Sequence, residues 1–138
     1  MIMSDPISTA RAMDEVWNDH DLDAAVDFFT EDAVVRMVPA PPGGKESITG
    51  RRQIREWAQD FFNQDFHVES TNYQAMDNIV TWDSAVHLDR FAEMGVDPVH
   101  FSIESVWEDG KVKQFTARTA EVTLKKLQEI EAAAYGGG

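Results

Sequence analysis

A histidine and a carboxylate stand two residues apart in a segment where apolar side chains alternate with others. His87 and Asp89 flank Leu88, and residues two apart in a β-strand point to the same face of a sheet. On an apolar wall such a pair can share a proton, and its pKa values shift toward the range that general acid–base catalysis uses. We therefore predict that His87 and Asp89 are the catalytic residues, with both side chains turned inward.

The opposite arrangement of this strand stays open. Its other face carries Val80, Trp82, Ser84, Val86, Leu88 and Arg90. If that more apolar face packs against helices, His87 and Asp89 lie in solvent or at a dimer interface. A metal site completed by His100 is disfavoured, because the alternation places His100 on the other side of the sheet. We expect no metal and no cofactor.

Apolar periodicity predicts helices followed by a long sheet. Spacings of three and four residues predict helices at about 7–18, from Asp21, from Gly50 and around 124–130. Alternation predicts strands at 33–38 and at about 68–76, 79–91, 99–107 and 111–122. Turns are expected at 77–78, 95–98 and 109–110, and a Pro/Gly loop at 39–44. This order predicts one α+β domain over residues 1–138, with a flexible tail at 135–138.

The predicted sheet has one apolar face, which we expect to form the concave wall of a cavity. A type I turn with a Gly bulge at 108–110 would pair Trp107 with Lys111. Ile103 would then pair with Phe115, and both side chains would lie on this apolar face. Such a cavity suits a small apolar organic ligand, although core packing explains any single aromatic residue more often. The predicted pocket residues are Met13, Trp17, Met37, Trp57, Phe101, Ile103, Trp107 and Phe115.

Composition excludes several classes of function. The 138 residues include no Cys, which excludes disulfides and thiolate sites, and the 12 basic against 25 acidic residues give a formal charge of −13. This charge disfavours nucleic acid as a partner. No segment approaches the ~18 consecutive apolar residues of a membrane span, and the first six residues lack the basic and apolar regions of a secretory signal. We expect a cytoplasmic protein without a membrane partner.

Several motifs resemble the nuclear transport factor 2-like superfamily. They are Asp21-Leu22-Asp23, Phe28-Phe29, Glu31 to Val35, Gly50 with Ile54 to Trp57, and Trp107 to Val112. The resemblance extends from about Ser8 to Leu127. It implies a cone-shaped, curved antiparallel sheet with three N-terminal helices covering the concave face. The superfamily includes ketosteroid isomerases, limonene epoxide hydrolases, SnoaL-like polyketide cyclases, scytalone-type dehydratases and binding modules, so the fold does not fix the activity.

The catalytic groups of these relatives do not carry over to this chain. The isomerase tyrosine falls on Met13, and its general-base aspartate falls on Met37. The epoxide hydrolase tyrosine and asparagine fall on Val35 and Met37, and its final aspartate lands near Ala117. Its Arg-x-Asp motif aligns loosely with His87-Leu88-Asp89.

These observations predict a small-molecule enzyme of the SnoaL-like type. His87 with Asp89 would transfer a proton on an apolar cyclic or polyketide-like substrate, as a cyclase, isomerase, dehydratase or epoxide hydrolase. The alternative is a non-catalytic ligand-binding or dimerisation module of the same fold. Under either hypothesis we expect a homodimer through the outer sheet face, because the inward orientation of His87 leaves an apolar patch outside, made of Trp82, Val86 and Leu88.

Overall fold

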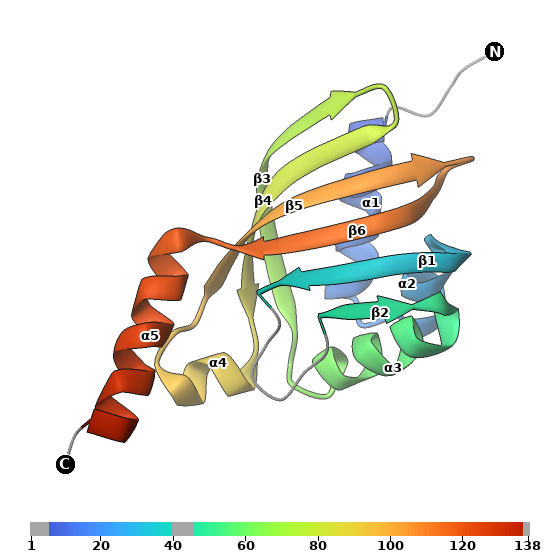
Figure 1. The fold of residues 1–138 in the computed structure, drawn as a ribbon. Coiled ribbons are helices and arrows are strands. Elements are labelled where there is room, and N and C mark those ends of the chain that lie inside the picture. Colours follow the sequence, from blue (N-terminus) through green and yellow to red (C-terminus); the bar gives the residue numbers. More distant parts are fainter. Residues whose placement is uncertain (1–5, 40–45, 137–138) are drawn as a thin grey trace.

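One six-stranded sheet runs through the structure, a computed structural model that describes residues 6–39 and 46–136 (Figure 1). The strands are β1 (Phe29–Val38), β2 (Ser47–Thr49), β3 (His67–Met76), β4 (Ile79–His87), β5 (Val99–Glu108) and β6 (Lys111–Thr119). Their order across the sheet is β2-β1-β6-β5-β4-β3, so β3 forms one edge. β1 and β6 are parallel, and the other neighbours are antiparallel. The predicted α+β class is confirmed.

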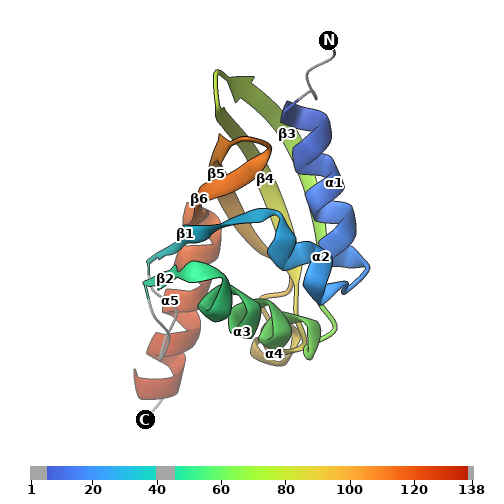
Figure 2. The same cartoon turned by 90° about the vertical axis from the view of Figure 1, so that its right-hand side faces the viewer.

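Helices cover one side of this sheet. The helices of the described residues are α1 (Pro6–Asn18), α2 (Leu22–Asp27), α3 (Gly50–Phe62), α4 (Asp89–Met94) and α5 (Glu121–Gly136). α1, α2 and α3 lie on the same side (Figure 2), where α1 packs against β3 and α3 against β1. We call this side of the sheet the inner face and the opposite side the outer face. No helix in the described part of the chain is long and apolar enough to cross a membrane.

Local sequence explains where the covering helices form. The buried side chains of α1 are Ala10, Met13 and Trp17, at the spacing of three and four residues that marks one helix face. α2 begins after Asp21, whose side chain accepts a hydrogen bond from the backbone N–H of Ala24 at 3.2 Å, as an N-cap does. Gly50 starts α3 with a φ of +86°, a conformation that residues with a Cβ rarely adopt.

The core lies between the helices and the inner face. On β5 the buried residues are Val99, Phe101, Ile103, Ser105 and Trp107, so this wall of the sheet is oriented as predicted. On β4 the pairs Trp82 with Ile103 and Val86 with Val99 place the even-numbered residues on the same inner face. Trp82, Val86 and Leu88 are therefore buried, and the prediction of an outer apolar patch made of these three residues is wrong.

Burial free energy explains the orientation of β4. Burying a valine or leucine side chain stabilises the fold by about 1.5–3 kcal/mol each. Turning the odd-numbered residues inward would instead bury only Ile79 and Ala85 among apolar groups and would remove water from Asp83 and His87. The structure thus adopts the second of the two arrangements considered from the sequence.

The strand predicted at 79–91 is too long. β4 ends at His87, and Asp89 is the first residue of α4, a short helix that the alternation pattern does not reveal. The backbone N–H of Asp89 donates to the carbonyl oxygen of Gln64 at 3.0 Å rather than to a neighbouring strand. The final strand is likewise shorter than predicted, because β6 stops at Thr119 and α5 begins at Glu121.

The β5–β6 hairpin differs from the predicted turn but keeps the predicted faces. Glu108 pairs with Lys111, and Asp109 and Gly110 both have positive φ, which makes this a two-residue type I′ turn. The register shifts instead between Val106 and Trp107, where β6 has one extra residue, Lys113, between the partners Gln114 and Val112. That shift restores the alternation, so Ile103 and Phe115 stay on the inner face even though Ile103 pairs with Ala117 and not with Phe115.

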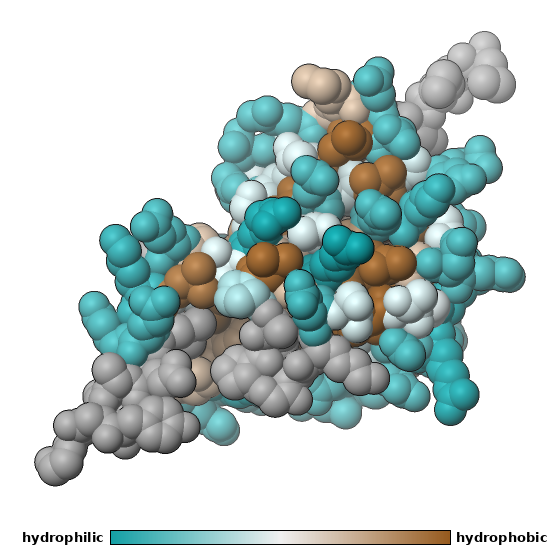
Figure 3. Space-filling model, in the orientation of Figure 1, coloured by the Kyte–Doolittle hydropathy of each residue, from teal (hydrophilic) through white to brown (hydrophobic). Residues whose placement is uncertain are grey.

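The outer face carries apolar and charged side chains side by side (Figure 3). Val106 lies opposite Ile79, and Ile79 lies opposite Met76 on the edge strand. The exposed fractions of Ile79 and Met76 are 36% and 75%. Residues 40–45, which hold most of the predicted Pro/Gly loop, lie outside the described residues. The predicted tail at 135–138 begins within α5, and residues 137–138 lie outside the described residues.

Candidate functional site

His87 and Asp89 do not come together in the structure. His87 lies at the end of β4 on the outer face, and its Nδ1 is 2.9 Å from Oδ2 of Asp97. Asp89 is exposed at the start of α4. The carboxylate partner of His87 is therefore Asp97, which lies ten residues further along the chain in the loop before β5.

His100 is exposed, and the described residues contain no group of three or more side chains placed to hold a metal ion.

The predicted pocket residues pack against one another. Met13, Trp17, Phe101, Ile103 and Trp107 belong to the buried core, and Met37, Trp57 and Phe115 are half-buried against it. Trp17 is the centre of an aromatic cluster, with ring centroids of Trp57 and Phe62 at 5.3 and 5.4 Å. Its indole Nε1 is buried without a hydrogen-bond partner among the described residues. An acceptor that enters this interior would find one unused donor.

A partly buried carboxylate, that of Asp14, lies on α1 next to buried Met13. Asp14 lies on α1 and faces the edge strand β3, where the hydroxyl of Tyr73 donates a hydrogen bond to its Oδ2. Burial raises the pKa of Asp14 above its usual value, and hydrogen bonds with Ser70 and Tyr73 oppose that rise. Burial, followed by the hydrogen bond and the negative charge of Asp14, raises the pKa of Tyr73. Asp14 is thus a carboxylate that holds its proton more tightly than one in water.

Neighbouring side chains fix the position of Tyr73. Its ring stacks on Trp82 with centroids 5.4 Å apart, and the guanidinium carbon of Arg11 lies 5.2 Å from the ring centroid on α1. The hydroxyls of Ser70 and Ser84 are 3.2 Å apart across β3 and β4. We call Arg11, Asp14, Ser70, Tyr73 and Ser84 the Asp14 cluster.

A bulge in β3 brings Tyr73 to this cluster. The register of β3 with β4 shifts between Thr71 and Gln74, and Asn72 has a φ of +61°. Without the shift, strict alternation from Ser70 would turn Asn72 inward and Tyr73 outward. The bulge reverses this order, so Tyr73 reaches over Trp82 to Asp14. The end of α1 is held on the same strand by Asn18, whose side chain bonds both backbone groups of Val68 at 2.7 and 2.9 Å.

Sequence reasoning missed the Asp14 cluster because Asp14-Glu15 has the composition of a solvated acidic face. One signal was present in the sequence. Asp14 lies four residues after Ala10 and three before Trp17, both of which are buried, and these spacings belong to one helix face. A carboxylate at the border of an apolar stripe is a candidate for burial.

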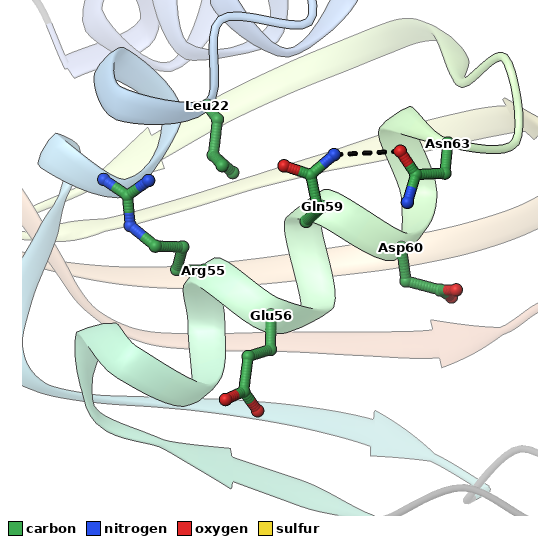
Figure 4. Close-up of a pocket in the computed structure, with 6 residues that line it drawn as sticks. All are labelled: Leu22, Arg55, Glu56, Gln59, Asp60 and Asn63. Atoms are coloured by element: carbon green, nitrogen blue, oxygen red, sulfur yellow. Dashed lines mark hydrogen bonds between the residues drawn. The ribbon is translucent and has the colours of Figure 1, made fainter.

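The helices α2 and α3 carry two surface hollows. One, of about 410 Å³, is lined by Leu22, Arg55, Glu56, Gln59, Asp60 and Asn63 (Figure 4). The other, of about 440 Å³, is lined by Asp23, Val26, Asp27, Arg51, Arg52 and Arg55. Its arginines already have partners, because Arg51 donates to the carbonyl of Phe29 at 2.8 and 2.7 Å and Arg55 pairs with Asp23. Neither hollow brings together groups suited to acid–base chemistry.

Comparisons with known proteins agree with this architecture. A family model described as SnoaL-like domain matches residues 10–114. The epoxide hydrolase/cyclase-like enzyme SalBIII, of pyran ring formation in the polyether salinomycin, is 19% identical, with a TM-score of 0.71 over 86% of this chain and 92% of that one. No match is found among curated proteins.

Two bacterial structures extend the comparison. A protein described as a ketosteroid isomerase from Kribbella flavida is 18% identical, with a TM-score of 0.67 over 84% of this chain and 78% of that one. One described as a polyketide cyclase from Sinorhizobium meliloti is also 18% identical, with a TM-score of 0.65 over 80% and 93%. Identities this low establish the shared fold and leave the activity to the residues of the site.

Proposed function

Because the chain belongs to the SnoaL-like domain family, we propose that it is a small-molecule enzyme that transfers a proton by general acid–base catalysis. The substrate is an apolar cyclic or polyketide-like compound, and the proton-transfer group is Asp14. The observation that carries this proposal is the Asp14 cluster: a largely buried carboxylate in a hydrogen bond with a tyrosine, at the border of an apolar core. A carboxylate with a raised pKa is a stronger base than one in water.

The two members of the hydrogen bond have complementary tasks. Asp14 removes a proton from a carbon beside a carbonyl group, and the electron pair of that C–H bond moves onto the carbonyl oxygen. Tyr73, whose raised pKa keeps it protonated, has one O–H, so as Asp14 takes up the proton this hydroxyl turns from Asp14 and donates its hydrogen bond to the developing oxyanion. In the isomerisation of a β,γ-unsaturated ketone, Asp14 returns the proton to a second carbon while the oxyanion re-forms the carbonyl. In a cyclisation, the enolate carbon attacks a second carbonyl carbon of the substrate, and the alkoxide that forms takes the proton from Asp14.

Deuterium exchange tests the proton-transfer step before the natural substrate is identified. The wild-type protein is incubated in D2O with a panel of cyclic monoketones, with and without a carboxylate group, and incorporation of deuterium beside the carbonyl is measured by mass spectrometry. We expect exchange above the buffer rate, and a loss of about 10²- to 10⁴-fold in the Asp14→Asn variant. Asp19→Asn, at an exposed carboxylate just after α1, is the matched control and retains the wild-type rate.

The same assay decides between this proposal and its alternatives. If His87→Ala removes exchange and Asp14→Asn does not, the catalytic group is His87, as predicted from the sequence, with Asp97 as its carboxylate partner. If the wild-type protein exchanges no ketone above the buffer rate, the enzyme proposal is rejected in favour of a non-catalytic ligand-binding module.

We also propose that two copies associate through the outer face. Across the sheet, Arg118 lies opposite Ser102, and Ser102 lies opposite Asp83, so one row runs from a cation on β6 to a carboxylate on β4. A two-fold rotation places Arg118 on Asp83 of the partner subunit, and the apolar residues Val106 and Ile79 lie four residues away along β5 and β4. Light scattering should show a dimer that Arg118→Glu dissociates and the control Arg52→Glu does not, and a monomeric wild type would contradict the proposal.

A further inference from the structure

Arg11 stands at the exposed edge of the Asp14 cluster, and we propose that it binds an anionic oxygen group of the ligand, such as a carboxylate. The substrate class is then an apolar organic acid rather than a neutral compound. This inference rests on the proposed function, because it names the substrate of the same site.

Arg11 has no carboxylate partner in the described part of the chain. Arg52, Arg55 and Arg90 form ion pairs there, with Glu56, Asp23 and Asp60. Arg36, Arg51 and Arg118 also lack a carboxylate partner among the described residues, so what distinguishes Arg11 is its position beside Tyr73 and Asp14. A cation left without a counter-ion beside a candidate active site is available to a ligand.

The local geometry offers Arg11 a counter-ion that it does not take. Glu15 lies four residues later on α1, a spacing at which oppositely charged side chains meet on a helix. The guanidinium lies instead over the ring of Tyr73, 5.2 Å from its centroid. A cation–π contact of this kind uses none of the guanidinium N–H groups in an ion pair, and these form the fork that matches a carboxylate.

This position also suits the chemistry of the cluster. Tyr73 joins the two groups, because its ring contacts Arg11 and its hydroxyl bonds Asp14. A ligand whose anionic group is held by Arg11 is thereby placed beside Tyr73, on the cluster that contains Asp14. Arg11 is thus a binding and positioning residue, and Asp14 transfers the proton.

Two fluorescent dyes that differ only in charge test the inference. 8-Anilinonaphthalene-1-sulfonate carries one sulfonate, and N-phenyl-1-naphthylamine has the same rings without it. We expect the wild-type protein to bind the anionic dye more tightly, and Arg11→Met to weaken that binding by about tenfold, as the loss of one charge-assisted hydrogen bond implies. The affinity for the neutral dye should stay the same. Arg11→Lys, which keeps the charge but not the fork, should recover part of the loss.

Arg52→Met is the matched control, because Arg52 is an arginine with a 93% exposed side chain on α3. The proposal is overturned if Arg11→Met weakens neither dye or both dyes equally, if Arg52→Met has the same effect as Arg11→Met, or if the wild-type protein binds neither dye. Dye binding requires no turnover. The dye experiment can therefore be interpreted even if no deuterium exchange is found. Equally, a negative dye result would contradict ligand binding by Arg11 but not proton transfer by Asp14.

Discussion

The pH dependence of stability gives the sharpest test of the environment of Asp14. Burial raises the pKa of Asp14 in the folded state above its ordinary value of 3.8. Between that value and the folded-state pKa, the native protein binds more protons than the unfolded chain, so its free energy of unfolding falls as the pH rises. The stabilising contribution is complete below pH 3.8 and is lost as the pH passes through the folded-state pKa. Asp14→Asn, which cannot ionise, should remove this decline.

The size of the stability change follows from the width of the pH interval between 3.8 and the folded-state pKa of Asp14. The contribution of Asp14 to the free energy of unfolding changes by about 1.4 kcal/mol for each pH unit of the interval. Relative to wild type, Asp14→Asn should therefore gain stability steadily as the pH rises from 4, and the gain should level off above the folded-state pKa. Tyr73→Phe keeps the ring but removes the hydroxyl that lowers the pKa of Asp14. We expect it to extend the interval and to cost about 1–3 kcal/mol at neutral pH.

Urea denaturation between pH 4 and pH 8 measures these differences, with the four tryptophans as fluorescent probes. The quantity compared is the free energy of unfolding of each variant minus that of wild type at the same pH. Asp19→Asn is the control for the loss of an exposed carboxylate. A flat difference for Asp14→Asn would show that Asp14 titrates as it does in water, which would also remove the basis for its catalytic assignment. A difference that falls with pH would show that its hydrogen bonds outweigh burial.

Three further variants test the fold and the outer surface. Ile54→Ala, at a fully buried position of α3, should lower the free energy of unfolding in urea by about 2–5 kcal/mol. Gly50→Ala, at a φ of +86°, should lower it by about 1–2 kcal/mol, measured by thermal melting. Asp97→Asn, which breaks the half-exposed pair with His87, should change it by about 1 kcal/mol or less in urea.

Features set by local sequence were predicted well. The alternation of β5 and the turn residues Asp77-Asn78 and Asp109-Gly110 depend on neighbours along the chain, and their positions are confirmed. The inward face of β4 depends on its pairing with β5, because either set of alternating residues fits a strand in isolation. The pairing of Trp82 with Ile103 turns the even-numbered residues of β4 toward the core.

The candidate site lay beyond sequence reasoning for a similar reason. Asp14 and Tyr73 are 59 residues apart, and they meet only because the bulge at Asn72 turns Tyr73 inward. Nothing in the alternation of β3 indicates that bulge, because positive φ at a non-glycine residue has only a weak sequence signal. The pair His87 and Asp89 was conspicuous because it is local, whereas the partner that the fold supplies to His87 is Asp97.

The position of Asp14 also explains why catalytic residues could not be carried over from relatives one by one. The resemblance places a tyrosine at position 13, where this chain has Met13, a buried core residue. Successive residues of an α-helix differ by about 100° in direction, so the residue after Met13 points away from the centre of the sheet and toward its β3 edge. There it accepts a hydrogen bond from Tyr73, whose ring lies beneath Arg11, and the centre is filled by Trp17 and its aromatic neighbours. The scaffold of the family is therefore compatible with an acid–base group displaced by one residue along α1, and a substrate of this protein would approach from the edge strand.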